Sequence, residues 1–307
     1  MELATVKAQN GKISFPYIPV AVFIGGTSGI GRATAEALAR YTNGNTNIII
    51  VGRNRAAADS IIASFPRPSF PSVKHEFIQC DVTLLKNVRQ TTNEILSRHS
   101  KINLLVISTG EMELFNREIT EDGLDRIVVL AYYSRWKFIH GLMPALAKAK
   151  EANEDAKVLS VASAGLGGKV DLEDLELKKV SLIPFLRSIS TYNDLMVEGF
   201  ALHFPSITFI HCSPGRVRTP LGSNSSSILF RTLSFLINSP FSPWYYYSLA
   251  PEDAGEYQLY GILYTASAPG AWRITQDGSD LGKKGYNGDE NARDVLWRYT
   301  LEVTSTK

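Results

Sequence analysis

A glycine-rich stretch near the start of the chain has the residue types and spacing of a phosphate-binding turn. Gly25, Gly29 and Gly31 have the spacing GxxxGxG. The apolar run Val20–Ile24 precedes them, and the alanine-rich run Arg32–Tyr41 follows. The first glycine permits a tight turn, the second lets the backbone approach a phosphate, and the third lets a helix pack closely on a strand. Free N–H groups at the start of that helix would then face a pyrophosphate.

Polar side chains near this turn indicate which dinucleotide would bind. Thr27 and Ser28 supply hydroxyls, and Ile30 lies between the last two glycines. Arg53 and Asn54 follow the second apolar run, where an acidic residue would bind a ribose 2′-OH. Arginine suits a 2′-phosphate instead, so we expect NADP(H) rather than NAD(H). The alternative is a glycine turn without a ligand and a solvated surface arginine.

Short apolar runs separated by helical stretches must position these residues. We expect strands at Val20–Ile24, Asn47–Val51, His75–Gln79, Ile102–Ile107, Lys157–Ala162 and Ile207–Cys212. We expect helices at Arg32–Tyr41, Ala56–Phe65, Leu84–Arg98, Gly123–Ala149, Thr191–His203 and Pro251–Ala266. Strands that alternate with helices of this length form βαβ units. The predicted fold class is α/β, a single-domain, Rossmann-type, doubly wound parallel sheet of about seven strands flanked by helices.

The whole chain, 1–307, is predicted to form this one domain. Three segments depart from the alternating pattern. We expect an insertion at about 165–189, a substrate lid at about 221–250 and a C-terminal extension at about 285–307, made of a loop and a short helix.

The apolar segment 227–249 contains Arg231, Pro240 and Pro243, so it fails as a membrane-spanning helix. Residues 228–237 could form an amphipathic helix, with peripheral membrane contact as the alternative to a lid.

Composition excludes several function classes. The chain is 44% hydrophobic and 20% charged with a net charge of +2, which is typical of a globular protein. Its Lys and Arg are scattered, so we expect no nucleic-acid partner. Cys80 and Cys212 follow apolar runs and should be buried thiols, and no His/Cys spacing suggests a metal. The N-terminus lacks a signal-peptide core, so a cytoplasmic location is expected.

The order of further motifs resembles that of the short-chain dehydrogenase/reductase superfamily over roughly residues 18–270. Asp81-Val82 resembles the pair that frames adenine, LLVISTG ends in a glycine where the family has LVNNAG, and SPGRVRT resembles the segment that lines the nicotinamide. GGTSGIG, VGRN, AYYSR and FIHCSPGRVRT are similar to divergent fungal members from natural-product pathways. The resemblance implies further cofactor contacts at Asp81, Val82, Gly110, Tyr192, Pro214, Gly215, Val217 and Thr219.

The same resemblance assigns the catalytic roles. Ser163 in SVASAG would orient a carbonyl, and Tyr192 in STYNDLMVE would donate the proton. Met196 stands where the family has its lysine, and Ala131 where it has its asparagine. An unassisted tyrosine has a pKa of about 10 and stays protonated at neutral pH, so it would serve reduction better than oxidation.

Three other charged residues are candidates near this site. Arg135 lies one helical turn after Ala131 and could replace the missing cation, or it could serve in packing or a surface ion pair. Glu111 and Glu113 follow the fourth predicted strand. Either could be the acid or base of an isomerase or cyclase, or a solvated loop carboxylate.

The sequence therefore predicts an NADPH-dependent carbonyl reductase that acts on a hydrophobic secondary-metabolite intermediate. A non-redox cyclase, isomerase or dehydratase is the first alternative, because Met196 and Ala131 replace two catalytic residues. A catalytically silent NADP(H)-binding protein is the second. The resemblance also allows a homodimer through the helix near 123–149 and the Tyr192 helix.

Overall fold

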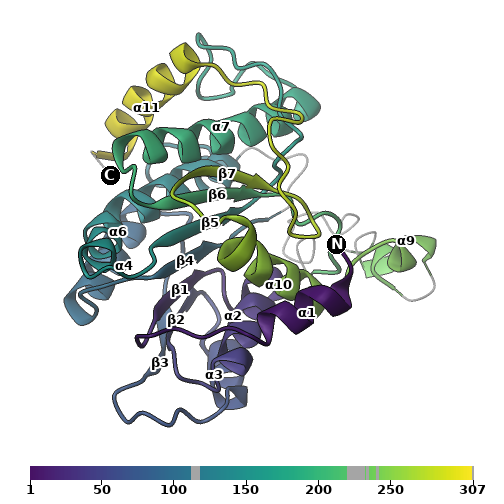
Figure 1. Cartoon of the computed structure of the whole chain (residues 1–307). Coiled ribbons are helices and arrows are strands. Elements are labelled where there is room, and N and C mark those ends of the chain that lie inside the picture. The colour runs from purple at the N-terminus through teal and green to yellow at the C-terminus, as the bar shows by residue number, and fades with distance from the viewer. Residues whose placement is uncertain (112–117, 220–231, 233–234, 240–241, 306–307) are drawn as a thin grey trace.

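The computed structural model describes residues 1–111, 118–219, 232, 235–239 and 242–305. Its centre is a seven-stranded sheet in the order β3-β2-β1-β4-β5-β6-β7, in which all paired strands are parallel (Figure 1). The strands are β1 (Val20–Ile24), β2 (Asn47–Gly52), β3 (His75–Gln79), β4 (Leu104–Ile107), β5 (Lys157–Val161), β6 (Thr208–Cys212) and β7 (Gly270–Ile274).

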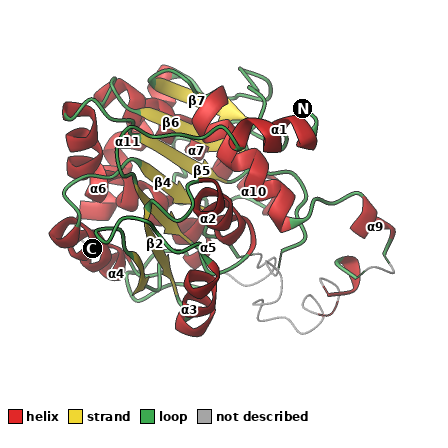
Figure 2. Ribbon diagram, turned by 60° about the horizontal axis from the view of Figure 1, so that its bottom comes forward, coloured by secondary structure: helices red, strands yellow, loops and turns green. Residues whose placement is uncertain are grey.

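Helices cover both faces of this sheet (Figure 2). They are α1 (Leu3–Asn10), α2 (Gly29–Tyr41), α3 (Arg55–Ser64), α4 (Leu85–Arg98), α5 (Arg126–Val128), α6 (Ser134–Glu151), α7 (Leu182–His203), α9 (Pro243–Tyr246), α10 (Pro251–Tyr260) and α11 (Glu290–Ser305), with π-helical segments η1 (Val129–Tyr133) and η3 (Gly261–Thr265). One face packs on α4, α6 and α7, and α11 lies on α7. The other face packs on α2, α3 and α10, and α1 lies on α10.

The strands are apolar along their length because each is buried on two faces. In β1, Val20, Val22 and Ile24 pack into the core under α4, α6 and α7. Ala21 and Phe23 alternate with them and pack under α2 and α3. A continuous apolar run is typical of a parallel strand covered on both sides. The predicted doubly wound parallel sheet is confirmed.

Several boundaries differ from the prediction for identifiable reasons. The helix of Tyr192 begins at Leu182, since Pro184 lies in its first turn, where proline is tolerated. The last eight residues of the predicted 165–189 insertion, 182–189, are therefore helical. The long helix expected over 123–149 is instead α5, η1 and α6 in succession. Strand β7 was not located from the sequence.

The C-terminal extension is more than an appended loop. Its helix α11 has 16 residues and packs along α7. The ring of Trp297 lies so close to Gly199 that a Cβ there would be 2.7 Å from Cε3. The predicted short helix is thus a long one that completes the core on this face.

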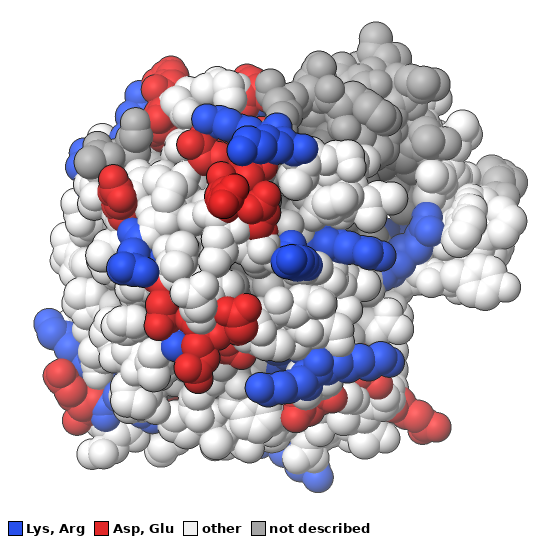
Figure 3. All heavy atoms as spheres, turned by 90° about the horizontal axis from the view of Figure 1, so that it is seen from above, with Lys and Arg blue, Asp and Glu red and all other residues white. Residues whose placement is uncertain are grey.

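The surface charges and the predicted apolar segment contribute little to positioning the candidate site. Figure 3 shows a face on which Lys and Arg side chains are interspersed with Asp and Glu. Among the described helices, none has the length and apolar character to cross a bilayer. Most of the amphipathic helix expected at 228–237 lies outside the described residues. Cys80 and Cys212 are buried free thiols, as predicted.

The contact between α2 and α10 depends on a glycine. A Cβ added to Gly255 would lie 2.6 Å from the carbonyl carbon of Ala33 and 2.8 Å from its oxygen. Because the helices would have to separate, we expect Gly255→Ala to lower the free energy of unfolding by about 1–3 kcal/mol. Urea denaturation followed by circular dichroism measures this change. Unaltered stability would show that the two backbones can separate at little cost.

Candidate active site at the carboxyl edge of the sheet

The glycine loop joins β1 to α2 at the carboxyl edge of the sheet. Gly25 has φ of +85°, a conformation that favours glycine, and its N–H donates to the carbonyl of Val51 at 2.8 Å. A Cβ on Gly31 would lie 2.2 Å from Oγ of Ser108 and 2.7 Å from the carbonyl oxygen of Gly25. Only glycine at position 31 lets α2 pack this closely against the ends of β1 and β4.

This loop lies where the strand order reverses, between β1 and β4. Open α/β sheets bind ligands in the crevice outside the carboxyl ends of the strands at such a point. Ser28 precedes α2 and makes no capping hydrogen bond with its side chain, so first-turn N–H groups remain open to an anion. A cavity of about 210 Å³ beside the loop is lined by Thr27, Ser28, Gly29, Arg32, Ala33, Glu36, Pro251 and Glu252. The first-turn N–H groups and the hydroxyls of Thr27 and Ser28 fit a dinucleotide phosphate.

The other predicted cofactor contacts lie at the same edge. Arg53 and Asn54 follow β2, Asp81 and Val82 follow β3, Gly110 follows β4, and Pro214, Gly215, Val217 and Thr219 follow β6. Thr219 reaches the glycine loop, since a Cβ on Gly29 would lie 3.0 Å from its Cγ2. Ends of strands that are far apart in the sequence therefore converge on the loop.

Two of these side chains form hydrogen bonds within their own turns. Oδ1 of Asn54 caps α3 by accepting from the N–H of Ala57 at 3.0 Å. Oδ1 of Asp81 accepts from the N–H and the hydroxyl of Thr83, at 3.0 and 2.7 Å. Both side chains therefore shape their turns, independently of any ligand.

Ser163 follows β5 with its backbone held on both sides. Its N–H donates to Nε2 of His211 at 3.1 Å, and its carbonyl accepts from the hydroxyl of Ser190 on α7 at 2.6 Å. Neither bond uses the hydroxyl of Ser163, which belongs to a half-buried residue. The serine is thus positioned through its main chain.

His211 belongs to a buried network that the sequence did not reveal. Its Nδ1 lies 2.6 Å from Oδ1 of Asp194, which also accepts from Nε of Arg273 at 2.8 Å. The side chains of His211 and Asp194 are fully buried. Because Nδ1–H donates to the carboxylate, Nε2 is the free acceptor for the N–H of Ser163. In the sequence, Asp194, His211 and Arg273 are isolated polar residues within apolar runs, which indicates that they are buried. Only the tertiary fold brings the three side chains together.

The side chain of Tyr192 does not lie beside Ser163. Its side chain is fully buried, its hydroxyl donates to the carbonyl of Leu175 at 3.2 Å, and its ring lies edge-on to Tyr132 with centroids 5.2 Å apart. Burial raises the pKa of the phenol well above its ordinary value. Residues two apart on a helix point about 200° apart, so Tyr192 faces away from Ser163 when Ser190 faces it. The structure does not bring Tyr192 and Ser163 together.

The two substituted positions are also filled by packing. Met196 is 1% exposed, in the core under α7. Ala131 lies in η1, and its carbonyl accepts from Nδ2 of Asn193 at 3.0 Å. Oδ1 of Asn193 in turn accepts from the hydroxyl of Ser160 at 3.1 Å. The Asn193 side chain of α7 thus joins Ala131 of η1 to Ser160 of β5.

Arg135 carries a buried charge to the ends of β4 and β5. It is 3% exposed and donates to the hydroxyl of Ser160 at 2.8 Å, to the carbonyl of Ile107 at 3.3 Å and to the carbonyl of Thr109. Burial lowers its pKa to about 10, so it remains protonated at neutral pH. The guanidinium therefore packs at the ends of β4 and β5, and its burial excludes the surface ion pair.

Glu111 is not a solvated loop carboxylate. Its side chain is 7% exposed and lies between Arg53 and Arg126, whose nitrogens are 2.9 and 2.5 Å from its oxygens. Glu113 lies outside the described residues.

The described part of the apolar segment is anchored to the loop after β6. The N–H of Arg218 donates to the carbonyl of Leu249 at 3.0 Å, and its guanidinium lies over the ring of Tyr245 at 4.3 Å. Tyr246 and Tyr247 are 76% and 82% exposed. Aromatic side chains therefore stand beside the carboxyl edge and face solvent.

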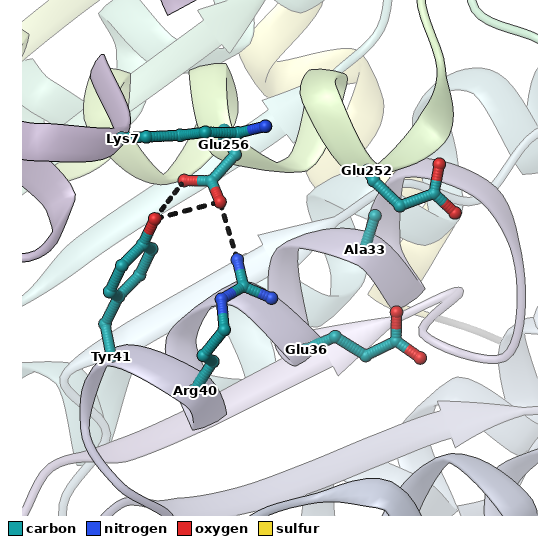
Figure 4. A pocket seen from close by; sticks show the side chains of 7 residues that line it. All are labelled: Lys7, Ala33, Glu36, Arg40, Tyr41, Glu252 and Glu256. Atoms are coloured by element: carbon teal, nitrogen blue, oxygen red, sulfur yellow. Dashed lines mark hydrogen bonds and ion pairs between the residues drawn. The ribbon is translucent and has the colours of Figure 1, made fainter. Parts of the chain in front are cut away.

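A second cavity, of about 310 Å³, lies between α1, α2 and α10 (Figure 4). Its buried carboxylate, Glu256, accepts from Arg40 at 2.6 Å, from Tyr41 and from Asn10 of α1. These bonds hold α1 against the domain. Because this α10 carboxylate is already bonded to α1 and α2, the cavity is structural and no candidate active site.

A parallel sheet with a glycine turn at its switch point is the arrangement of a dinucleotide-binding protein. The sequence model described as short chain dehydrogenase matches residues 19–170. The chain is 33% identical over 314 residues to oxidoreductase AN1596 of Emericella nidulans, which covers 100% of this chain and 91% of that protein. It is 33% identical over 251 residues to oxidoreductase andH of Emericella variicolor, over 81% of this chain and 71% of that relative.

A solved structure shares the fold. The 3-ketoacyl-(acyl-carrier-protein) reductase from Brucella melitensis, complexed with NADH, matches with a TM-score of 0.59 and 19% identity, over 87% of this chain and 98% of that one. The chain belongs to the short-chain dehydrogenase family, a family of oxidoreductases, as its motifs predicted.

The Asp194 network provides a test of how Ser163 is held. In Asp194→Asn the charge of Arg273 loses its buried partner, so we expect a loss of about 3–5 kcal/mol in the free energy of unfolding. Urea denaturation measures the loss. Hydrogen exchange should also quicken at the amide of Ser163, compared with Asp289→Asn in the loop before α11. Equal exchange in both variants would show that the network does not position the serine.

Proposed function

We propose that the protein reduces a carbonyl group of a hydrophobic secondary-metabolite intermediate with NADPH. The observation that supports this most is the convergence of the glycine loop, Arg53 and the half-buried Ser163 at one edge of the sheet. The loop offers N–H groups to a pyrophosphate, and Arg53 offers a guanidinium suited to a 2′-phosphate. Aromatic side chains near Tyr245 give this edge an apolar border.

NADPH, when bound, supplies the hydride, and the chain supplies binding, orientation and electrostatics. The hydroxyl of Ser163 donates a hydrogen bond to the carbonyl oxygen, on which negative charge develops. The buried guanidinium of Arg135 lies under the ends of β4 and β5 and adds a fixed positive charge to this region. Since the phenol of Tyr192 is bonded to Leu175 in the core, we assign the final proton to water rather than to Tyr192.

Two variants test this assignment. We expect Ser163→Ala to lower kcat/KM by about 10²–10³-fold, because it removes the hydrogen bond to the developing oxyanion. We expect Tyr192→Phe to keep most of the activity and to lose about 1 kcal/mol of stability, the worth of its bond to Leu175. NADPH consumption with a panel of apolar aromatic ketones and quinones measures the first effect. Undiminished turnover by Ser163→Ala would contradict the mechanism, and loss of turnover in a folded Tyr192→Phe would return proton donation to Tyr192.

The burial of Tyr192 also favours a second candidate function, a non-redox cyclase, isomerase or dehydratase. Such chemistry needs no phenol next to the nicotinamide. Mass spectrometry of products formed with and without NADPH separates the two candidates. Reduction predicts a product two hydrogens heavier that forms only with NADPH, whereas a product of unchanged mass, or one lighter by water, that forms without NADPH supports the second candidate.

A further inference from the structure

The ends of β2 and β4 are joined by an ion pair that the proposed mechanism does not use. Oε1 of Glu111 lies 2.9 Å from Nη1 of Arg53, and Oε2 lies 2.5 Å from Nη2 of Arg126. The carboxylate is 7% exposed, whereas the side chain of Arg53 is 50% exposed. A nearly buried carboxylate therefore holds an otherwise accessible guanidinium.

The topology places this pair across the path of a dinucleotide. β1 lies between β2 and β4 in the sheet, and the glycine loop leaves the end of β1. An ion pair from the end of β2 to the segment after β4 must therefore pass over that end. Arg53 is also the residue whose charge and position suit the 2′-phosphate of NADP(H). Glu111 thus holds the place of an anion at Arg53.

The two halves of the bridge differ. Oε1, the oxygen that faces Arg53, is buried and accepts no hydrogen bond of good geometry from the described residues. A buried acceptor without an aligned donor is stabilised less than a hydrogen-bonded one. The contact with Arg53 is therefore the half that an incoming anion can replace, while Arg126 keeps the carboxylate neutralised.

We propose that Glu111 determines dinucleotide specificity by competing with the 2′-phosphate of NADP(H) for Arg53. In the cofactor-free protein Glu111 neutralises Arg53. When NADP(H) binds, the phosphate takes Arg53 and Glu111 remains on Arg126. With NAD(H) the carboxylate can accept a hydrogen bond from the ribose 2′-OH. This inference rests on the proposed function only in taking the carboxyl edge as a dinucleotide site.

Binding measurements test the competition without any substrate. Dissociation constants of NADP⁺ and NAD⁺ are measured by isothermal titration calorimetry for the wild type and Glu111→Gln. We expect Glu111→Gln to bind NADP⁺ about tenfold more tightly, because one competing charge contact is removed, and NAD⁺ no more tightly than the wild type. Circular dichroism establishes that the variant is folded.

The matched control is Glu118→Gln. Glu118 is a carboxylate near the same Arg126, at 3.7 Å, but it is 69% exposed and does not pair with Arg53. Its replacement should leave both dissociation constants unchanged. An equal gain in both variants would mean a general charge effect and would overturn the proposal.

A double-mutant cycle with Arg53→Gln identifies the mechanism. If Glu111 acts by occupying Arg53, Glu111→Gln gives little gain in NADP⁺ affinity once Arg53 is gone. A full gain in that background would overturn competition for Arg53.

The remaining outcomes separate this inference from the proposed function. Failure of the wild type and Glu111→Gln to bind either dinucleotide overturns the proposed function itself. Tight dinucleotide binding with no change in Glu111→Gln overturns only the role of Glu111. A wild type that prefers NAD⁺, together with a Glu111→Gln variant that gains NADP⁺ affinity, corrects the proposed cofactor and supports Glu111 as the cause.

Discussion

The carboxylate of Asp194 lies in the protein core between an imidazole and a guanidinium, and the carboxyl edge of the sheet around Ser163 depends on it. Through His211 and Arg273 it joins α7 to β6 and β7, and through His211 it reaches the backbone of Ser163. An isolated carboxylate here would be very costly, so all three side chains must be placed together. The loop after β5 is therefore held rigidly against the sheet. The position of Ser163 is fixed by groups that take no direct part in chemistry.

A second set of buried polar contacts lies beside the first. It affects how Met196 and Ala131, which the sequence analysis placed at the lysine and asparagine positions, are interpreted. Arg135 and Asn193 both bond to Ser160, and Asn193 also bonds to the carbonyl of Ala131. In the family that the chain belongs to, a relay that includes the asparagine and the lysine serves the tyrosine. Here Ser160 links Arg135 and Asn193, which also bond to the main-chain carbonyls of Ile107 and Ala131. Met196 lies in the core, Ala131 packs against it, and the phenol of Tyr192 is bonded to Leu175.

Local patterns predicted the fold because they are set by local physics. A strand buried on two faces must be apolar throughout, as in β1, and a tight strand-to-helix turn must have glycine where Ser108 approaches Gly31. The family motifs then located Ser163 and the loop after β6. The orientation of Tyr192 could not be read in this way. Ser190, two positions earlier on the same helix, faces Ser163, whereas Tyr192 faces Tyr132. Motif matching assigns a residue to a helix without fixing the direction of its side chain.

Motif matching is limited in the same way for charged residues, because it does not show which partner a charge meets in the fold. Arg53 alone, read at the end of an apolar run, indicates a phosphate site. Its meaning changes when Glu111, which is far away in the sequence, lies 2.9 Å from it. Whether such an arginine favours NADP(H) depends on the difference between its energy with the phosphate and its energy with the internal carboxylate. The selectivity of this edge is therefore a property of the Arg53–Glu111–Arg126 bridge as a whole. That bridge exists only because the parallel sheet brings the ends of β2 and β4 to the same side.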